Sequence, residues 1–359
     1  MESIVREIPP IKRLIIPSIF IVSLYFFQMQ RGQNTQQKWS IQGSIMGTTY
    51  TVQVVAPKAP NAEDIQALLD KINQKMSTYI QESELNQLNR SPADQTFQAS
   101  DALHHVLQAS MKVYKESQGA FDITIGPLVN AWGFGPDKKR KSPSTEQIKA
   151  LLPTIGSHLL QVKQQKWSKQ RADLYCDLSA IAKGYAVDQV SHFLSQHQFN
   201  NHWVEIGGEV KTKGYNAQGK AWRVGVERPA KQQRRAIYQI IPLWNMSMAT
   251  SGDYRNHYVD EQGIERSHTI DPRTGMPITH TLASVSVLHA ENMYADAWAT
   301  ALNVLGIEAG LKIANQYQLA AFFISKHEKE GTIHFTHHLS QALEHYLTQQ
   351  KVTLAKTKH

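Results

Sequence analysis

Helical and strand-like segments follow one another in irregular order along this chain of 359 residues. Some segments repeat apolar residues at the helical period and others alternate apolar with polar residues, but the two kinds do not alternate regularly. A doubly wound parallel sheet requires a regular strand–helix repeat. The pattern therefore predicts an α+β fold, in which mixed helices and a mostly antiparallel sheet form one large domain.

The expected elements follow from periodicity and capping residues. Helices are expected after the capping residue Asn61, at 84–89 as a further turn, at 101–117, at 144–152 and at 180–198. Strands are expected at 45–55, 174–178, 202–206, 222–226, 236–243, 283–288 and 319–325. The alanine-rich segment from Ala295 is expected to form a helix closed by Gly306.

An apolar run near the N-terminus indicates export. Three basic residues (Arg6, Lys12 and Arg13) precede it, and it is 14 residues long, from Leu14 to Phe27. This is short for a spanning helix of about 20 residues but typical of a signal-peptide core. Because neither a small-residue cleavage site nor a cysteine follows, we expect an uncleaved anchor. The basic flank keeps the N-terminus cytoplasmic, so the body is expected to face the periplasm from a bacterial inner membrane.

The chain is accordingly divided into four parts: 1–30 as signal peptide or membrane anchor, 31–40 as linker, 41–340 as the domain, and 341–359 as a C-terminal tail.

The formal net charge of +8 is modest, and the densest run of basic residues, Lys138 to Lys141, lies among glycine and proline without interleaved aromatic residues. This run indicates a solvated loop, so no nucleic-acid partner is expected. The single cysteine, Cys176, excludes an internal disulfide and a cysteine-cluster metal site.

Asp296 and Thr300 are four residues apart in the expected alanine-rich helix and so share one face. A carboxylate and a hydroxyl in this arrangement offer two oxygens to a hard cation such as Mg²⁺. The same pair also occurs on ordinary helix faces, so a metal-binding role for it depends on support from the other motifs of the chain. In another part of the sequence, Asp177 lies at an expected strand-to-helix junction, where helix amides attract anions.

Lys183 follows six residues after Asp177 and can meet a phosphate, or can be an ordinary surface lysine. Gly207-Gly208-Glu209 can let the backbone approach a ligand or simply form a turn. The glycine-rich dinucleotide fingerprint, the phosphate-binding loop and the serine-hydrolase elbow do not occur in the sequence. Their absence removes support for the corresponding NAD-dependent, nucleotide-hydrolysing and serine-hydrolase folds.

Several ordered blocks together resemble the ApbE family of FAD:protein FMN transferases over about residues 40 to 325. The blocks are Met46-Gly47-Thr48-Thr49-Tyr50, Met76-Ser77-Thr78-Tyr79, Gly119-Ala120-Phe121-Asp122 with Gly126-Pro127, Asp177 to Tyr185, Ile206 to Glu209, Thr250 to Arg255, Ser267-His268-Thr269-Ile270-Asp271-Pro272, and Ala295-Asp296 through Thr300. The resemblance implies Mg²⁺-dependent transfer of FMN from FAD to a threonine or serine hydroxyl of a partner protein, with release of AMP.

The resemblance also implies roles for individual residues. The FAD site would be lined by Met46, Tyr79, Ala120, Phe121, Asp122, Asp177, Lys183 and Ile270. Asp296, Thr300 and the backbone oxygen of Ala180 would hold Mg²⁺, His268 would be the general base, and Asp253 would assist it. Where some relatives carry a second carboxylate, three residues after the metal-binding aspartate, this chain has Ala299. Fewer protein ligands and more water would suit Mg²⁺.

Two other functions remain open at this point. One is a protein that binds FAD without catalysis, and the other is a pyrophosphatase that releases free FMN. The expected partners are FAD, an acceptor subunit of a membrane redox complex, and the membrane through the N-terminal segment.

Overall fold

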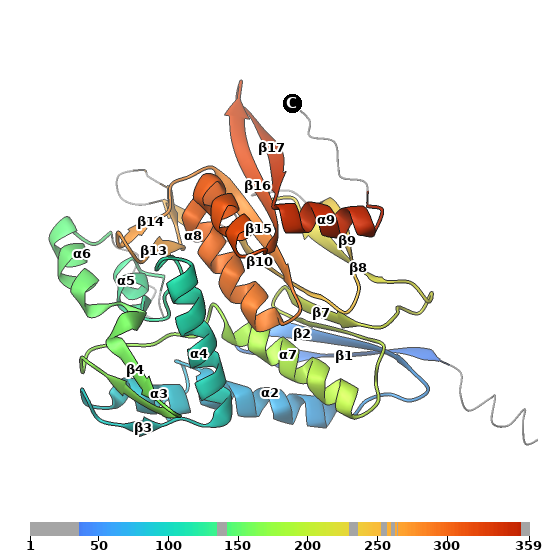
Figure 1. Cartoon of the computed structure of the whole chain (residues 1–359), viewed down its shortest axis with the longest axis horizontal. Coiled ribbons are helices and arrows are strands. Elements are labelled where there is room, and N and C mark those ends of the chain that lie inside the picture. Colours follow the sequence, from blue (N-terminus) through green and yellow to red (C-terminus); the bar gives the residue numbers. More distant parts are fainter. Residues whose placement is uncertain are drawn as a thin grey trace, which may run out of the picture.

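A sheet of eight strands runs through the centre of the protein (Figure 1). The computed structural model describes residues 36–134, 142–229, 236–252, 257–259, 263 and 265–352. In spatial order the strands are β1 (Gln37–Ile45), β2 (Thr48–Ala56), β6 (His202–Ile206), β7 (Glu209–Lys213), β10 (Ser247–Gly252), β15 (Leu282–His289), β16 (Ala320–Lys329) and β17 (Thr332–Leu339). Every neighbouring pair in this order is antiparallel. The predicted α+β class with a mostly antiparallel sheet is confirmed.

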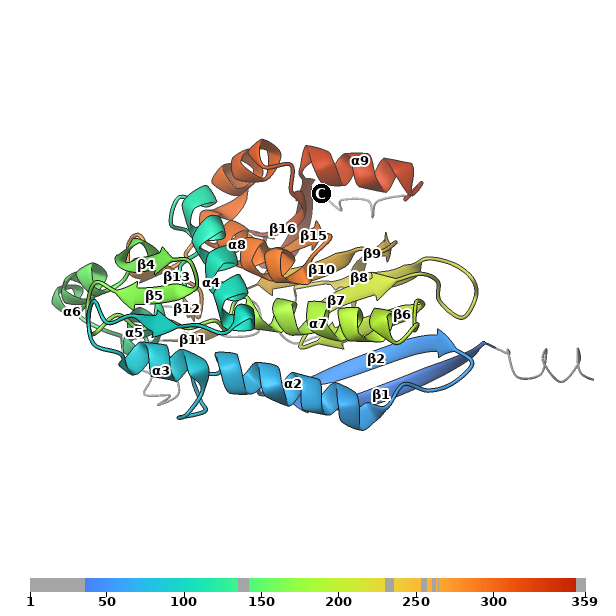
Figure 2. The same ribbon diagram turned by 60° about the horizontal axis from the view of Figure 1, so that its bottom comes forward.

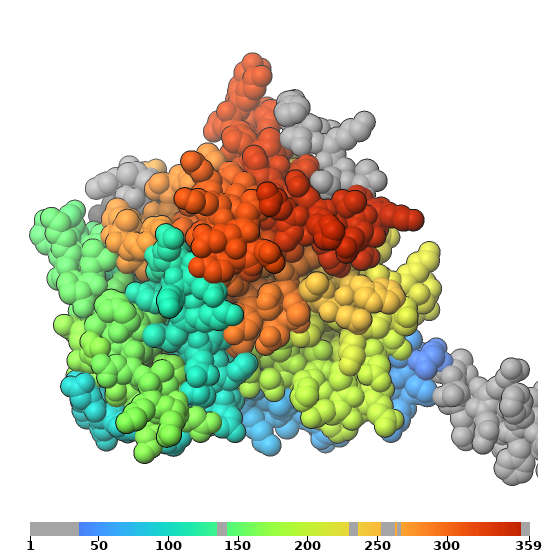
Figure 3. Space-filling view, in the orientation of Figure 1, coloured from blue at the N-terminus to red at the C-terminus, as the bar shows by residue number. Residues whose placement is uncertain are grey.

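Four helices cover one face of the sheet (Figure 2). They are α2 (Ala62–Met76), α4 (Asp101–Glu116), α7 (Ala182–Gln196) and α8 (Asn292–Gln316). Figure 3 shows α4 and the α8 segment side by side on the surface of this face. The opposite face is covered by the hairpin of β8 (Trp222–Glu227) and β9 (Ile237–Leu243) and by α9 (Gln341–Gln349).

The two faces of the central strands enter two separate cores. In β16, Ala321 and Phe323 pack against the helices, whereas Phe322 and Ile324 pack under the β8–β9 hairpin and α9. Successive side chains of a strand point to opposite faces, so a strand covered on both sides is apolar throughout. Strand β15 is likewise covered on both sides and is buried at seven consecutive positions, although Ser284 and Ser286 alternate there with apolar residues.

Smaller elements flank the main sheet. They are α3 (Glu84–Arg90), α5 (Gly126–Ala131), α6 (Thr145–Leu151), the short helical turns Leu152–Thr154 and Ser157–Leu159, and the strands β3 (Phe97–Gln98), β4 (Leu160–Lys163), β5 (Lys166–Lys169), β11 (His257–Val259), β12 (Glu265–Ser267), β13 (Ile270–Asp271) and β14 (Met276–Pro277). Strands β3, β5 and β4 form a small sheet, and β11–β12 and β13–β14 form separate two-stranded ladders.

Side-chain caps explain where several helices begin. Asn61 accepts a hydrogen bond from the Glu63 amide at the start of α2, as its position in the sequence predicts. Ser100 caps α4, and Ser144 forms a reciprocal capping box with Gln147 at the start of α6. Each cap satisfies a backbone donor that the first helical turn leaves without a partner.

Four expectations about elements are corrected. The segment 174–178 is not a strand, because its amides find other acceptors: Cys176 donates to the Asn89 side chain and Asp177 to the Ile123 carbonyl. The expected strand 45–55 is divided by the Met46-Gly47 turn. Gly306, at φ 74°, kinks α8 without ending it.

The fourth correction concerns the two flanks of the domain. The stretch expected as a linker to residue 40 contributes its last four residues to β1. The stretch expected as a tail contains α9, whose Leu343 and Leu347 are buried. The N-terminal apolar run, 14–27, lies outside the described residues. Among the described residues, no helix combines the length and apolarity needed to cross a membrane.

His202 is fully buried and is held in its neutral form. Its Nδ1 donates to the Phe199 carbonyl at 2.7 Å, and its Nε2 accepts from the Ser191 hydroxyl at 2.8 Å. Burial lowers the pKa of His202 to about 4, and Lys213 and Lys211 act in the same direction. The folded state therefore binds fewer protons than the unfolded chain, whose histidines titrate near pH 6.5.

We expect His202 to make stability depend on pH. Its contribution is complete above about pH 6.5 and should fall by about 3 kcal/mol as the pH drops to 4. Urea unfolding of wild type and His202→Asn between pH 4 and 8 measures the effect, with exposed His197→Gln as control. The Asn variant should be less stable at pH 7 and should lose this part of the slope. Parallel profiles for wild type and His202→Asn would contradict the assignment.

Candidate active site

Two tight turns lie next to each other at one end of the sheet. Met46 and Gly47 join β1 to β2 with φ values of 50° and 72°, and Gly207 and Gly208 join β6 to β7 with 61° and 105°. Positive φ at both central residues is the geometry of two-residue hairpin turns. The Gly207 amide donates to the Thr49 carbonyl at 3.0 Å, so the two turns are neighbours. We call this edge the turn end of the sheet; it contains the predicted residue Met46.

Helices α7 and α8 approach each other closely beside the turn end. A Cβ added at Gly184 would lie 2.5 Å from the Asn292 carbonyl oxygen and 2.8 Å from Met293 Cα. Only glycine permits this approach. It allows Asp296, on α8, to accept a hydrogen bond from the Gly184 amide at 3.1 Å through Oδ2. A buried carboxylate thus lies at the positive N-terminal end of α7.

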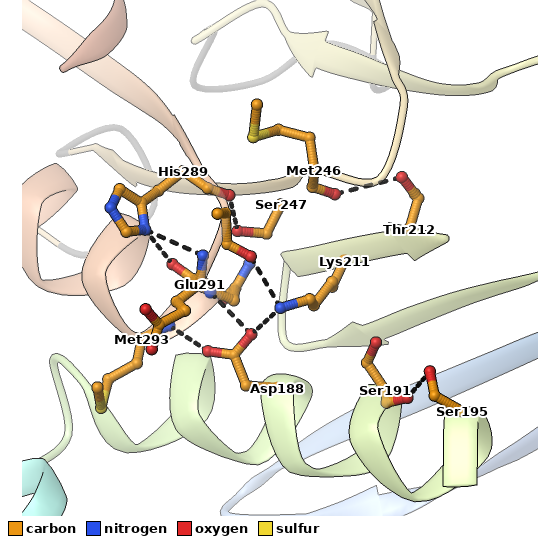
Figure 4. Close-up of polar contacts among 12 residues, drawn as sticks. Asp188, Ser191, Ser195, Lys211, Thr212, Met246, Ser247, His289, Glu291 and Met293 are labelled. Carbon is orange, nitrogen blue, oxygen red and sulfur yellow. Dashed lines mark hydrogen bonds and ion pairs between the residues drawn. The ribbon is translucent and has the colours of Figure 1, made fainter. Parts of the chain in front are cut away.

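The same helix pair contains a second aspartate in the reverse arrangement (Figure 4). Asp188, on α7, accepts the amides of Asn292 and Met293 at the start of α8, each at 2.9 Å. Lys211 donates to its Oδ1 at 2.6 Å. Both carboxylate oxygens of Asp188 are therefore occupied by protein donors, and its role is structural.

Asp296 differs from Asp188 in having an oxygen to spare. Among the described residues, its hydrogen bonds all go to Oδ2, which leaves Oδ1 for another partner. Thr300 lies one turn further along α8, and its hydroxyl is 3.3 Å from the Ser251 hydroxyl of β10. The Gly184 amide, which would bond the Ala180 carbonyl in a regular helix, is engaged by Asp296 instead.

These three oxygen donors suit a hard divalent cation with water completing its shell. The predicted metal residues Asp296, Thr300 and Ala180 would supply a carboxylate, a hydroxyl and a backbone carbonyl. Within the described ranges, no cluster of three or more histidine, cysteine or acidic side chains is arranged to bind a metal. Carboxylate, hydroxyl and carbonyl oxygens are hard ligands, which suit Mg²⁺ better than a soft transition metal.

Lys183 lies between Asp296 and Glu209, and the sequence alone does not predict its contact with Glu209. Its ammonium lies 3.2 Å from Glu209 Oε1, 3.5 Å from Asp296 Oδ2 and 3.1 Å from the Ser179 carbonyl. Burial alone would lower the pKa of Lys183, but the two carboxylates outweigh burial and raise it, so the ammonium stays charged. Burial raises the pKa of the Glu209 carboxyl group, and the negative charge of Asp296 adds to this while Lys183 opposes it.

The glycine pair before Glu209 is a hairpin turn, which is the simpler of the two sequence interpretations. This turn nevertheless places Glu209 at the first position of β7, facing α7. Lys183 was predicted to line the FAD site, and the structure places its charge between Glu209 and the predicted metal-binding aspartate.

The predicted FAD residues Ala120, Phe121 and Asp122 are buried in the loop after α4. The Asp122 carboxylate accepts hydrogen bonds from Thr124 and Ser157, through both the amide and the hydroxyl of each. The Asp122 side chain therefore holds the loop in place, and a flavin would contact the backbone of this loop. The loop approaches the 271–275 turn, since a Cβ at Gly119 would lie 3.8 Å from Arg273 Cγ.

Two asparagines of α3 hold the loops that carry Tyr79 and Asp177. Asn86 donates to the Thr78 and Ile80 carbonyls on either side of Tyr79, at 3.0 and 2.9 Å. Asn89 exchanges two hydrogen bonds with the Cys176 backbone, one residue before Asp177. Tyr79 is 78% exposed, so its ring is available for contact with a ligand. The spacing of three residues places both asparagines on one helix face, which is the only signal that the sequence carries for them.

His268 follows β12 in a segment anchored to α8. Thr269, the next residue, accepts a hydrogen bond from the Asn303 side chain at 3.3 Å, and Asn303 lies three residues beyond Thr300. The His268 ring meets the Phe134 ring edge-to-face, with centroids 6.3 Å apart. Ile270 is buried in the same small core as Leu128 and Trp132. His268 is thus attached to the helix that carries Asp296, while Asp253 lies outside the described residues.

A cavity of about 400 Å³ between α4 and α7, next to His104, His105 and Tyr185, includes none of the predicted site residues.

The sequence did not predict Glu209 as the partner of Lys183, Ser251 as the partner of Thr300, or Asn86 as the residue that holds the Tyr79 loop. Glu209 and Ser251 do occur in the family blocks, so the blocks marked the correct segments without giving their contacts.

Gly184→Ala should destabilise the protein by about 1–3 kcal/mol or more, because the added methyl group meets backbone atoms that cannot rotate away. Gly310→Ala in α8 is the matched control: its Cβ would meet the Phe323 side chain at 3.0 Å, and alanine is the better helix former. Thermal unfolding of both variants tests this. A Gly184 variant as stable as the Gly310 variant would show that the helices can separate at small cost.

Comparison with known proteins identifies the family of this chain. The family model described as the ApbE family matches residues 46–323. The FAD:protein FMN transferase of Haemophilus influenzae is 41% identical over 297 residues, covering 79% of this chain and 86% of that protein. The fold and site define a flavin transferase scaffold, and this chain belongs to the ApbE family.

Solved structures extend the comparison to the fold. The flavin transferase ApbE from Vibrio cholerae superimposes with a TM-score of 0.77 at 35% identity, covering 86% of this chain and 99% of that one. The flavinyl transferase ApbE of Pseudomonas stutzeri, in its apo form, gives a TM-score of 0.77 at 35% identity and covers 86% and 96%. The sequence resemblance to this family is confirmed.

Proposed function

We infer that this protein is a FAD:protein FMN transferase. Relatives of which this chain covers 84–87% have this activity in their names. The structural observation that carries the inference is the spare oxygen of Asp296, beside Thr300 and at the N-terminus of α7. A cation and a helix N-terminus together suit a pyrophosphate, which is the part of FAD that must be cleaved.

In the proposed reaction a threonine or serine hydroxyl of the acceptor protein attacks the phosphorus of the FMN half of FAD. A new oxygen–phosphorus ester bond forms, the pyrophosphate bond breaks, and AMP leaves with its negative charge. His268 accepts the hydroxyl proton, which a neutral hydroxyl retains at physiological pH. When bound, Mg²⁺ supplies positive charge against the pyrophosphate oxygens. Asp296, Thr300 and the Ala180 carbonyl would hold it.

The remaining predicted residues divide between binding and support. We propose that Met46, Tyr79, Ile270 and the 120–122 backbone contact the flavin nucleotide, and that Asp177 and Lys183 lie toward its polar parts. Glu209 would orient Lys183 through their ion pair. Asp253 would assist His268. The acceptor would be a subunit of a membrane redox complex, modified after translation by covalent flavin.

We also propose that residues 1–30 anchor the protein in a bacterial inner membrane with the domain in the periplasm. The support is the basic flank and the apolar run of the sequence. A periplasm-dependent reporter fused after His359 should be active. Activity confined to a cytoplasmic reporter would refute this orientation.

One experiment separates the three candidate activities. The protein is incubated with FAD, Mg²⁺ and a candidate redox subunit, and a denaturing gel is inspected for flavin fluorescence on the subunit. A fluorescent subunit band with equimolar AMP supports transfer. Free FMN with AMP and no labelled protein would indicate a pyrophosphatase, and intact FAD bound without AMP would indicate a binding protein.

A further inference from the structure

Two exposed aromatic side chains contact each other at the edge of the protein. Tyr215 is 46% exposed and Trp244 is 39% exposed, although both are large apolar rings. Their ring centroids are 4.8 Å apart at an interplanar angle of 80°. Tyr215 lies in the loop between β7 and β8, and Trp244 in the loop between β9 and β10. Rings that leave this much area in water indicate a contact surface.

The aromatic pair lies at the end of the sheet where the described chain begins. Gln37, the first residue of β1, pairs with Ala56, and the neighbouring Val55 amide donates to the Asn201 carbonyl at 2.8 Å. The Asn201 side chain accepts the Tyr215 amide at 3.0 Å.

One further hydrogen bond extends this series to the second aromatic loop. The Gly214 amide donates to the side chain of Asn245, the residue after Trp244, at 2.9 Å. Hydrogen bonds therefore lead from the start of β1 to both aromatic loops. Figures 1, 2 and 3 show the start of β1 and the β7–β8 loop at the same end of the molecule, which we call the Gln37 end.

We propose that the Gln37 end is a membrane-contact surface, on which Tyr215 and Trp244 enter the interfacial layer of a lipid bilayer. Tyrosine and tryptophan suit this layer because they combine a large apolar ring with a polar group. The inference rests on the proposed N-terminal anchor and not on the transferase activity. Nine residues, 28–36, separate the apolar run from Gln37, so the chain can place Gln37 at most about 35 Å from the end of that run.

Charged residues at the Gln37 end add little net charge. Lys38, Lys58, Lys220 and Arg223 are exposed there, and Glu63 and Asp64 lie in the exposed first turn of α2. The lysines can reach lipid phosphates with their long side chains. The acidic pair offsets much of their attraction, so the aromatic contact should supply most of the binding and salt should weaken it little.

This orientation would hold the active site away from the lipid. Strand β2 runs for nine residues from Thr48, at the turn end, to Ala56, at the Gln37 end. At the rise of a β-strand these eight steps are a separation of about 26 Å. With the Gln37 end on the bilayer, the turn end with Lys183 and Asp296 faces an acceptor that projects from the same membrane.

The test uses the full chain reconstituted into vesicles of phosphatidylcholine and phosphatidylglycerol. Ala217→Cys places a fluorescent thiol label in the exposed β7–β8 loop without changing either ring, and Ile333→Cys places it at a 49% exposed position on β17. The native Cys176 is buried, and burial raises the pKa of its thiol to about 12, so the label reacts at the introduced cysteine. Nitroxide-labelled lipid quenches only labels that contact the bilayer.

We expect the label at 217 to lose most of its fluorescence and the label at 333 to keep it. Adding Tyr215→Ser and Trp244→Ser to the Ala217→Cys protein should restore fluorescence while the protein still sediments with the vesicles. Unquenched label at 217 in vesicle-bound protein would overturn the proposal, as would protein that does not bind vesicles. Shielding of the label at 217 that depends on protein concentration, without lipid quenching, would assign the surface to a second copy. FMN transfer by the detergent-solubilised chain, assayed separately, reports on the proposed function alone.

Discussion

Asp296→Asn should lower the rate of FMN transfer by about 100-fold or more. The substitution removes the negative charge that a hard cation needs, and even changes in the outer shell of a bound metal cost roughly 10–100-fold. The fold should survive, because the asparagine oxygen can still accept the Gly184 amide that now bonds Oδ2. High Mg²⁺ concentrations should restore part of the rate. Calorimetric titration with Mg²⁺ in the presence of FAD measures the lost binding directly.

Asp188→Asn is the matched control for this prediction. Asp188 shares the essential surroundings of Asp296, namely a helix N-terminus and a lysine, but protein donors occupy both of its oxygens. Its replacement should lower stability, because Lys211 loses its charged partner, and should leave the Mg²⁺ dependence of transfer unchanged. If both variants shifted the Mg²⁺ dependence equally, or if Asp296→Asn turned over normally at low Mg²⁺, Asp296 would not be a metal ligand.

The fold was predictable where the signal is local. The Asn61 cap, the alternation in β15 and the apolar periodicity of α4 each lie within a few residues of the element that they define. The errors arose where a distant partner decides the conformation. Residues 174–178 have the composition of a strand, but the side chain of Asn89, 87 residues before Cys176, takes the amide that a neighbouring strand would have bonded. A glycine that ends a helix and a glycine that kinks one look the same in a sequence, so the kink at Gly306 could not be distinguished from a helix end.

The candidate site shows the same division. The shared face of Asp296 and Thr300 follows from helical geometry alone, and the ordered blocks indicated the family. The contact of Lys183 with Asp296 spans 113 residues, and its contact with Glu209 depends on a hairpin turn placing β7 beside α7. Periodicity carries no information about such pairings. The distinction between Asp188 and Asp296 depends on which carboxylate oxygen the surrounding amides occupy, and only coordinates reveal this.

His268→Ala should slow FMN transfer by about 10²–10⁴-fold while leaving FAD and Mg²⁺ binding nearly intact. The range is that expected for losing a positioned general base. Binding should persist, because the proposed metal oxygens and flavin contacts belong to other residues. The deficit should shrink as the pH rises, because a growing fraction of the acceptor hydroxyl is ionised without assistance. FMN incorporation measured against pH for both forms, together with FAD titration, provides the comparison.

His280→Ala is the control that separates a base from a structural histidine. His280 lies beside the Gly306 kink, and its Nε2 is 2.8 Å from the Asn303 carbonyl of α8, close to the contact that holds Thr269. Its loss should lower the unfolding temperature and change the transfer rate by a factor that does not vary with pH. His268→Ala should do the opposite, with a nearly unchanged unfolding temperature and a deficit that varies with pH. A His268 variant that transfers FMN at the wild-type rate, or that loses FAD binding together with its folding transition, would exclude His268 as the base.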